Sequence, residues 1–166
     1  QKDRGWTSTI NTVTGSGNTA MLYARPGFVK VGKTSYGGDL ISPAFTKLIG
    51  TQTVTVTFKA IPYMTKAGAM DENVLKVSVI GPGTVSQEQF IIDNWPVYPA
   101  DDGAHTDYCV GMWSAPEATR TFTITGATSE TQIKFLGGDY DLTTEAGLPT
   151  RKNRIFLDDI KVEIVL

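Results

Sequence analysis

Two stretches without a regular hydrophobic period combine aromatic rings with carboxylates. The first, after residue 93, holds Trp95 and Tyr98 beside several acids, and the second holds Tyr140 between two of them. A fourth ring, Tyr36, lies in a glycine-rich turn. Carbohydrate binding needs flat apolar surfaces for the C–H faces of a sugar and polar groups for its hydroxyls. We therefore take Trp95, Tyr98, Tyr140 and Tyr36 as candidate ligand-binding residues, although such rings also pin long loops onto a fold.

Catalytic chemistry has weaker support in the sequence. His105 is the only histidine, and no Gly-x-Ser-x-Gly nucleophile elbow is present. Cys109 is the only cysteine, and one thiol with one imidazole supports neither a zinc site nor a catalytic pair. We expect no catalytic residue and no enzyme. Carboxylates in the loops could supply the pair that glycoside hydrolysis needs, but no motif selects two of them. These acids are Asp93, Asp101, Asp102, Asp107, Asp139 and Asp141.

The last stretch alternates from Asp158 onward, which predicts a strand with one buried and one solvated face. The pattern places Asp158 on the same face as Ile160, Val162 and Ile164, among core residues. A carboxylate there is costly unless it is paired, hydrogen-bonded or bound to a metal. Two interpretations stay open. Asp158 is a ligand of a structural Ca²⁺, which prefers oxygen donors, or it is satisfied by backbone N–H groups or by a cation such as Arg154.

Composition narrows the classes of protein. The formal net charge is −2, 19% of the residues are charged, and there is no Lys/Arg run, so nucleic acid is not expected as a partner. A single cysteine excludes a disulfide framework. No apolar run is long enough to cross a membrane, and no signal-peptide pattern is present at Gln1. We expect residues 1–166 to form one domain, which could be excised from a larger protein.

The sequence pattern predicts that the segments around these residues are β-strands. Thr51 to Ile61 alternates most clearly, and Asn73 to Ile80 is expected to form a hairpin with Val85 to Asp93. Leu40 to Phe45 is expected at a sheet edge because Pro43 has no N–H, and Asp107 to Trp113 is a further candidate. About nine or ten short strands without helices predict an all-β, two-sheet antiparallel β-sandwich.

Five segments follow one another in a suggestive order: Gly27–Gly32, Leu40–Phe45, Thr53–Ala60, Thr123–Phe135 and Arg154–Ile160. This order resembles the galactose-binding-like jelly-roll domains of secreted and surface proteins from Bacteroidetes-type bacteria, and it is more distantly similar to the family 4, 9 and 22 carbohydrate-binding modules. The resemblance implies a jelly roll and an extracellular or bacterial cell-surface location. It also implies an acidic residue on the last strand that helps to hold a structural Ca²⁺, and Asp158 matches that position.

The sequence therefore predicts a non-catalytic carbohydrate-binding module of a secreted or cell-surface glycan-degrading system, with a polysaccharide or oligosaccharide as its partner. The alternative is a structural or protein-interaction jelly roll of a surface lipoprotein without glycan binding, and a small hydrolase comes third. We expect no insertion into a membrane, and a monomer or one part of a multidomain chain.

Overall fold

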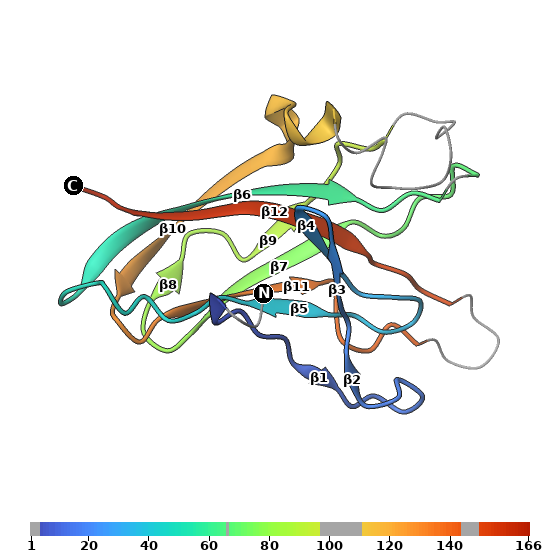
Figure 1. Cartoon of the computed structure of the whole chain (residues 1–166), viewed down its shortest axis with the longest axis horizontal. Coiled ribbons are helices and arrows are strands. Elements are labelled where there is room, and N and C mark those ends of the chain that lie inside the picture. Colours follow the sequence, from blue (N-terminus) through green and yellow to red (C-terminus); the bar gives the residue numbers. More distant parts are fainter. Residues whose placement is uncertain (1–3, 66, 97–110, 144–149) are drawn as a thin grey trace.

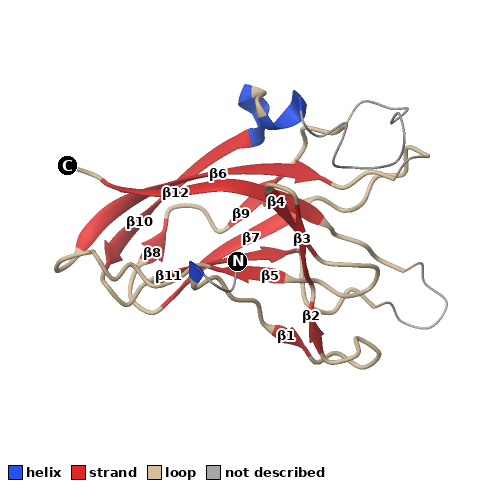
Figure 2. Ribbon diagram, in the orientation of Figure 1, coloured by secondary structure: helices blue, strands red, loops and turns tan. Residues whose placement is uncertain are grey.

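Two antiparallel sheets pack face to face in the computed structural model, which describes residues 4–65, 67–96, 111–143 and 150–166 (Figures 1 and 2). The elements are β1 (Ile10–Asn11), β2 (Thr19–Ala20), β3 (Leu22–Arg25), β4 (Phe28–Val31), β5 (Asp39–Ile41), β6 (Gln52–Pro62), β7 (Val74–Ile80), β8 (Thr84–Val85), β9 (Gln89–Ile91), the 3-10 helix η2 (Pro116–Ala118), β10 (Thr119–Ala127), β11 (Gln132–Gly137) and β12 (Ile155–Ile164). The larger sheet has the order β3-β4-β12-β6-β10-β8, the smaller β5-β11-β7-β9, and β1-β2 form a separate ribbon. The predicted all-β, two-sheet antiparallel sandwich is confirmed.

Consecutive strands from β4 to β12 alternate between the two sheets. The even-numbered strands of this run lie in the six-stranded sheet and the odd-numbered strands in the four-stranded sheet. Every connection therefore crosses from one layer to the other, as it does in a jelly roll. No helix in the described part of the chain is long and apolar enough to span a membrane.

Phe58 on β6 fills the centre of the space between the sheets. It is fully buried, and its ring centroid lies 5.2 Å from those of Phe90 and Phe135 on the opposite sheet and 6.0 Å from that of Phe122. Val54 and Val56 share its inward face, as the alternation of Thr51 to Ile61 predicts. Aromatic contacts at these separations add to the free energy gained by removing the rings from water.

The predicted hairpin forms only in part. β9 pairs with β7, from Val74 opposite Ile91 to Lys76 opposite Gln89. The intervening β8 instead pairs with β10 in the other sheet, through Ile124 opposite Val85. The predicted edge strand is confirmed, because β5 lies at the edge of the smaller sheet. The candidate strand Asp107 to Trp113 is wrong over its last three residues, because residues 111–113 are helical rather than extended. Residues 107–110 of that candidate strand lie outside the described residues.

A β-bulge in β12 overturns the predicted face of Asp158. Asp158 lies opposite Lys59 and Lys161 lies opposite Thr57, so two residues of β12 face one residue of β6. Asp159 adopts the left-handed conformation there, with φ of 48°. The extra residue inverts the alternation. Asp158 therefore shares the outer face with Lys59, whereas Ile160 packs against the core.

A nearly buried ion pair joins the start of β12 to the segment before β7. The side chains of Arg154 and Asp71 are only 11% and 3% exposed. Arg154 donates to the Asp71 carboxylate from its backbone N–H at 3.0 Å and from Nε and Nη2 at 2.8 Å each. Its guanidinium carbon also lies 3.5 Å from the ring centroid of Tyr63. Removal of one partner would leave the other charge buried and unpaired.

We expect Arg154→Leu to lower the free energy of unfolding by about 3 kcal/mol or more, because Asp71 then stays buried without its cation. Arg151→Leu is the matched control, since its pair with Glu72 is 50% and 43% exposed and should contribute less than about 1 kcal/mol. Chemical denaturation of the two variants measures the difference. Equal losses would contradict the assignment of Arg154 as a buried structural cation.

Candidate functional site

The outer face of the four-stranded sheet carries a row of side chains that crosses all four strands. Leu136 on β11 lies opposite Asp39 on β5 and opposite Lys76 on β7, and Lys76 lies opposite Gln89 on β9. Directly opposed residues in an antiparallel pair project to the same face. In the next row, Lys134 lies opposite Ser78. The outer face of the sheet therefore carries polar groups and two lysines, of which Lys76 is exposed and Lys134 is half-buried.

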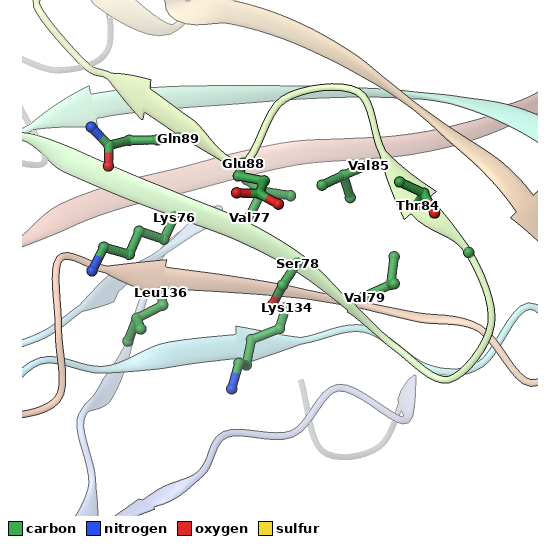
Figure 3. A pocket seen from close by; sticks show the side chains of 11 residues that line it. Lys76, Val77, Ser78, Val79, Thr84, Val85, Glu88, Gln89, Lys134 and Leu136 are labelled. Carbon is green, nitrogen blue, oxygen red and sulfur yellow. The ribbon is translucent and has the colours of Figure 1, made fainter.

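A hollow of about 590 Å³ adjoins this face along β7. We call it the β7 groove. Figure 3 shows Lys76, Ser78 and Lys134 on one side of the β7 ribbon, and Val85 and Glu88 on the other. The groove combines apolar side chains with hydroxyl, amide and charged groups, which is typical of ligand sites. Its lining residues are Lys76, Val77, Ser78, Val79, Gly83, Thr84, Val85, Glu88, Gln89, Lys134 and Leu136.

Two ammonium groups give the β7 groove its electrostatic character. Lys76 and Lys134 are diagonal neighbours across β7 and β11, a relation that puts residues roughly 7–8 Å apart. Neither lysine takes part in an ion pair with any described residue. Glu88 adds one carboxylate to the lining. The arrangement can hold a ligand that carries negative groups while hydroxyls and amides are bound nearby.

The groove also contains an open strand edge. Ile133 directs its N–H and C=O to Ser42 on the β5 side, through bonds of 2.8 and 2.9 Å. Ile133 and Val79 are paired across the strands, so they form a non-hydrogen-bonded pair and Val79 directs its own N–H and C=O away from β11. β9 pairs only with Val74 to Lys76, and no described strand pairs with Val79 on this side.

Tyr140 lies at the end of the outer face, beside the β7 groove. Its ring centroid is 5.4 Å from Nζ of Lys134, which lines the groove. Its hydroxyl donates a 2.5 Å hydrogen bond to Oδ2 of Asp39, a fully buried carboxylate. Asp39 also accepts from the Ser8 hydroxyl at 3.1 Å, and from the Thr9 N–H and hydroxyl at 2.7 and 2.6 Å. Burial and the bond to Asp39 raise the pKa of Tyr140 above its usual value.

Tyr36 shares this corner but holds the N-terminal segment in place. Its hydroxyl donates to the carbonyl of Thr14 at 3.1 Å. Asn11 donates from Nδ2 to the carbonyls of Gly37 and Tyr140, both at 2.9 Å. A Cβ atom on Gly37 would collide with the carbonyl of Asp139, so this close approach requires glycine. The structure therefore brings Tyr36 and Tyr140 together, with Tyr140 nearer to the groove through Lys134.

Trp95 belongs to another part of the surface. It follows β9, is half-buried, and donates its backbone N–H to the carbonyl of Asp93 at 3.0 Å. The neighbouring Asn94 donates to the carbonyl of Ala60 at 3.0 Å and accepts from Arg120 at 3.0 Å. The start of this predicted exposed loop is thus anchored to β6 and β10. Tyr98, His105 and Cys109 lie outside the described residues.

Asp158, the predicted calcium ligand, is half-buried on the outer face of the six-stranded sheet. Burial raises its pKa, the negative charge of Asp159 adds to this, and a backbone hydrogen bond and Lys59 oppose it. Lys59 itself pairs with Asp159 at 3.2 Å. No group of three or more His, Cys, Asp or Glu side chains in the described ranges could hold a metal ion. Calcium at Asp158 stays a prediction that would need backbone carbonyl ligands.

Sequence reasoning missed the two features that define this site. Lys76, which is exposed, and Lys134, which is half-buried, each sit at an outward position of an alternating strand, and that alternation was the available signal. Asp39 follows two glycines in a turn, and the donors that satisfy it come from residues 30 and 101 positions away. No local pattern could have marked it as buried.

We expect Tyr140→Phe to lower the free energy of unfolding by about 1–3 kcal/mol at neutral pH, because buried Asp39 loses a donor. The folded-state pKa of Tyr140 is raised, so this contribution is complete below the unfolded pKa of about 10 and is lost as the pH rises through the folded pKa. Denaturation curves of the variant and the wild type should therefore converge in strong alkali.

Tyr36→Phe is the matched control for that experiment. It removes the exposed bond to Thr14 and should change the free energy of unfolding by less than about 0.5 kcal/mol. A gap between wild type and Tyr140→Phe that persists unchanged at high pH would contradict the role given to the Tyr140 hydroxyl.

Comparison with known proteins adds little to this description. No protein-family model matches the chain. No curated protein matches it either. Among solved structures, the chain is similar to the K2 cleaved adhesin domain of Lys-gingipain (Kgp), with a TM-score of 0.40 and 18% sequence identity, over 98% of this chain and 89% of that chain. The fold assignment rests on the strand order and register given above, and not on this likeness.

Proposed function

We propose that this protein is a non-catalytic binding module and that its ligand is a glycan chain held in the β7 groove. The observation that carries the proposal is the pair of lysines, Lys76 and Lys134, beside a solvent-open hollow of about 590 Å³. Because the hollow is open to solvent, it can hold a few sugar rings of a longer chain, which an enclosed cavity cannot. Leu136 and Val85 offer apolar contacts for C–H faces, and Ser78, Thr84 and Gln89 offer hydrogen bonds for hydroxyls.

The charge of the groove favours an acidic glycan. Two ammonium groups without ion-pair partners among the described residues would each bind a carboxylate or a sulfate group. An exposed contact of this kind weakens with salt, because mobile ions screen it. The ligand class is therefore a polysaccharide or oligosaccharide with uronic acid or sulfated residues.

The predicted aromatic residues have different parts in this proposal. Tyr140 could extend the groove with a ring face beside Lys134, at 5.4 Å from its Nζ. Trp95, with Tyr98 after it, remains a candidate stacking platform at a second place on the surface. Tyr36 has no direct contact with the ligand in this proposal and contributes by its hydrogen bond to Thr14, which holds the N-terminal segment. An extracellular or cell-surface location belongs to the same proposal, through the resemblance of the ordered segments to surface jelly rolls.

A protein ligand is the second candidate, and the open edge at Val79 is the observation that favours it. An extended peptide could add to β7 there, with main-chain hydrogen bonds to Val79 and a side-chain contact to Val85. The chain would then be the protein-interaction jelly roll of the alternative prediction. The two candidates would occupy the same groove, and binding to acidic polysaccharides separates them.

Affinity electrophoresis in gels that contain polygalacturonate, alginate or chondroitin sulfate tests the first candidate, with neutral dextran as the reference polymer. We expect retardation by at least one acidic polymer, and Lys76→Gln with Lys134→Gln should reduce the affinity roughly tenfold or more, since each charge-assisted bond contributes about 1.5–3 kcal/mol. Lys47→Gln is the matched control, because Lys47 is exposed on a different loop.

Two further outcomes are informative. Retardation that Trp95→Ala abolishes and the lysine variants leave intact would move the glycan site to the Trp95 loop. No retardation by any polymer in the panel would contradict glycan binding and favour the peptide ligand.

Structural calcium at Asp158 is a separate part of the proposal. The carboxylates of Asp158 and Asp159 repel each other, and burial disfavours the charge on Asp158, so a cation would relieve both effects. We expect Ca²⁺ at a hundredfold excess over its dissociation constant to stabilise the fold by about 2.7 kcal/mol. Thermal unfolding with Ca²⁺ and with EDTA measures this.

Asp158→Asn should abolish the calcium response, whereas Asp141→Asn, at an exposed acid in another loop, should retain it. Identical melting curves in Ca²⁺ and EDTA would rule out the calcium site.

A further inference from the structure

The C-terminal half of β12 has an edge that no described strand covers. β4 pairs only with Ile155 to Leu157, whereas β6 accompanies β12 as far as Ile164. Figure 1 shows β12 continuing past β4 toward the C-terminus. Beyond the bulge at Asp159, one side of the strand is therefore open. An open edge presents unpaired N–H and C=O groups that can pair with another strand.

The backbone of this edge is set for pairing at alternate residues. Val165 donates its N–H to the carbonyl of Thr53 on β6 at 2.9 Å. Alternate residues of an antiparallel strand direct their backbone groups to opposite neighbours. Lys161 and Glu163 therefore face β6 with their N–H and C=O groups, and Val162 and Ile164 direct theirs to the open side.

Along the open edge, charged side chains lie on the outer face of the sheet and apolar side chains on the inner face. Lys161 and Glu163 project outward, because they lie opposite the outer-face residues Thr57 and Thr55. Val162 and Ile164 project inward and remain 37% and 48% exposed. They line an apolar hollow of about 370 Å³ with the 43–48 loop and Val54. They place exposed apolar surface beside the open edge, and pairing with a second chain would remove part of that surface from water.

We propose that this edge is a self-association surface, on which two copies of the chain pair their β12 strands antiparallel about a two-fold axis through Val162. In this register Val162 of each copy exchanges N–H···O=C bonds with Val162 of the other. Ile160 lies opposite Ile164 of the second copy, so the inward faces match apolar to apolar. Such an isologous contact is closed and self-complementary.

The charges select this register. With the axis at Val162, Lys161 of each copy lies opposite Glu163 of the other, which gives two unlike pairs. A shift of the axis to residue 161 would put Lys161 opposite itself, and a shift to residue 163 would do the same for Glu163. Like charges directly opposite each other in a sheet are destabilising. Lys161 and Glu163 already attract each other within one copy, at 2.8 Å, so the four groups would form a mixed-sign cluster at the axis.

Sedimentation equilibrium over a concentration series tests the proposal with charge reversals. The wild type is expected to dimerise. K161E places like charges opposite each other at both pairs, and so does E163K, so each single variant should dimerise roughly ten- to a hundredfold more weakly. The double variant K161E/E163K restores unlike pairs and should recover the wild-type constant. An equimolar mixture of the two single variants should form heterodimers for the same reason.

The structural control is built into this set, because both side chains are exposed, so all four proteins should melt alike at a concentration low enough to keep each of them monomeric. A wild type that stays monomeric at its highest soluble concentration would overturn the proposal. Dimers that the single reversals do not weaken, or a mixture that does not recover, would overturn this surface as the contact.

Hydrogen exchange gives a second readout. The amides of Val162 and Ile164 should be protected in the dimer and lose protection on dilution. Protection that persists in a monomer would show that a segment of the same chain covers the edge, and would also overturn the proposal.

Discussion

The contacts of Phe58 across the sandwich hold the two sheets together. Its ring on β6 meets Phe90 and Phe135 of the smaller sheet, so one fully buried side chain bridges both layers. With the inner faces committed to this packing, each strand can place polar groups only on its outer side. The lysines of β7 and β11 lie on the outer face for that reason, and the part of this face along β7 is open to a ligand.

A second constraint acts at the edge of that surface. Asp39 is a fully buried carboxylate whose donors come from the N-terminal segment and from Tyr140. A buried carboxylate is tolerated only when its lone pairs are satisfied, so three stretches of chain must meet there together. The meeting point fixes Tyr140 against Lys134 and thereby sets one end of the β7 groove. The position of the ring is thus a consequence of the need to satisfy Asp39.

The inner and outer faces of β6, β7 and β11 could be predicted from the sequence because side-chain alternation is a local property. The alternation of Val54 and Val56 with threonines was sufficient for β6. The face of Asp158 could not be predicted, because one left-handed residue, Asp159, inverts the pattern, and a non-glycine residue gives no advance sign of it. The burial of Asp39 and the transfer of β8 to the other sheet depend on groups far away along the chain. Both depend on tertiary contacts, which a local sequence pattern cannot predict.

The position of β12 has a consequence for how the chain reaches this state. It is the last strand of the sequence given, yet it lies in the interior of its sheet, between β4 and β6. Before it docks, those two strands have no shared neighbour, and the larger layer is split into two separate ribbons with unpaired borders. Because every link between β4 and β12 spans both layers, neither half can be completed from adjacent segments, and slow, topologically demanding folding follows. A chain emerging from the ribosome would hold that gap open until β12 had been released, and would need shielding from other nascent chains during that interval.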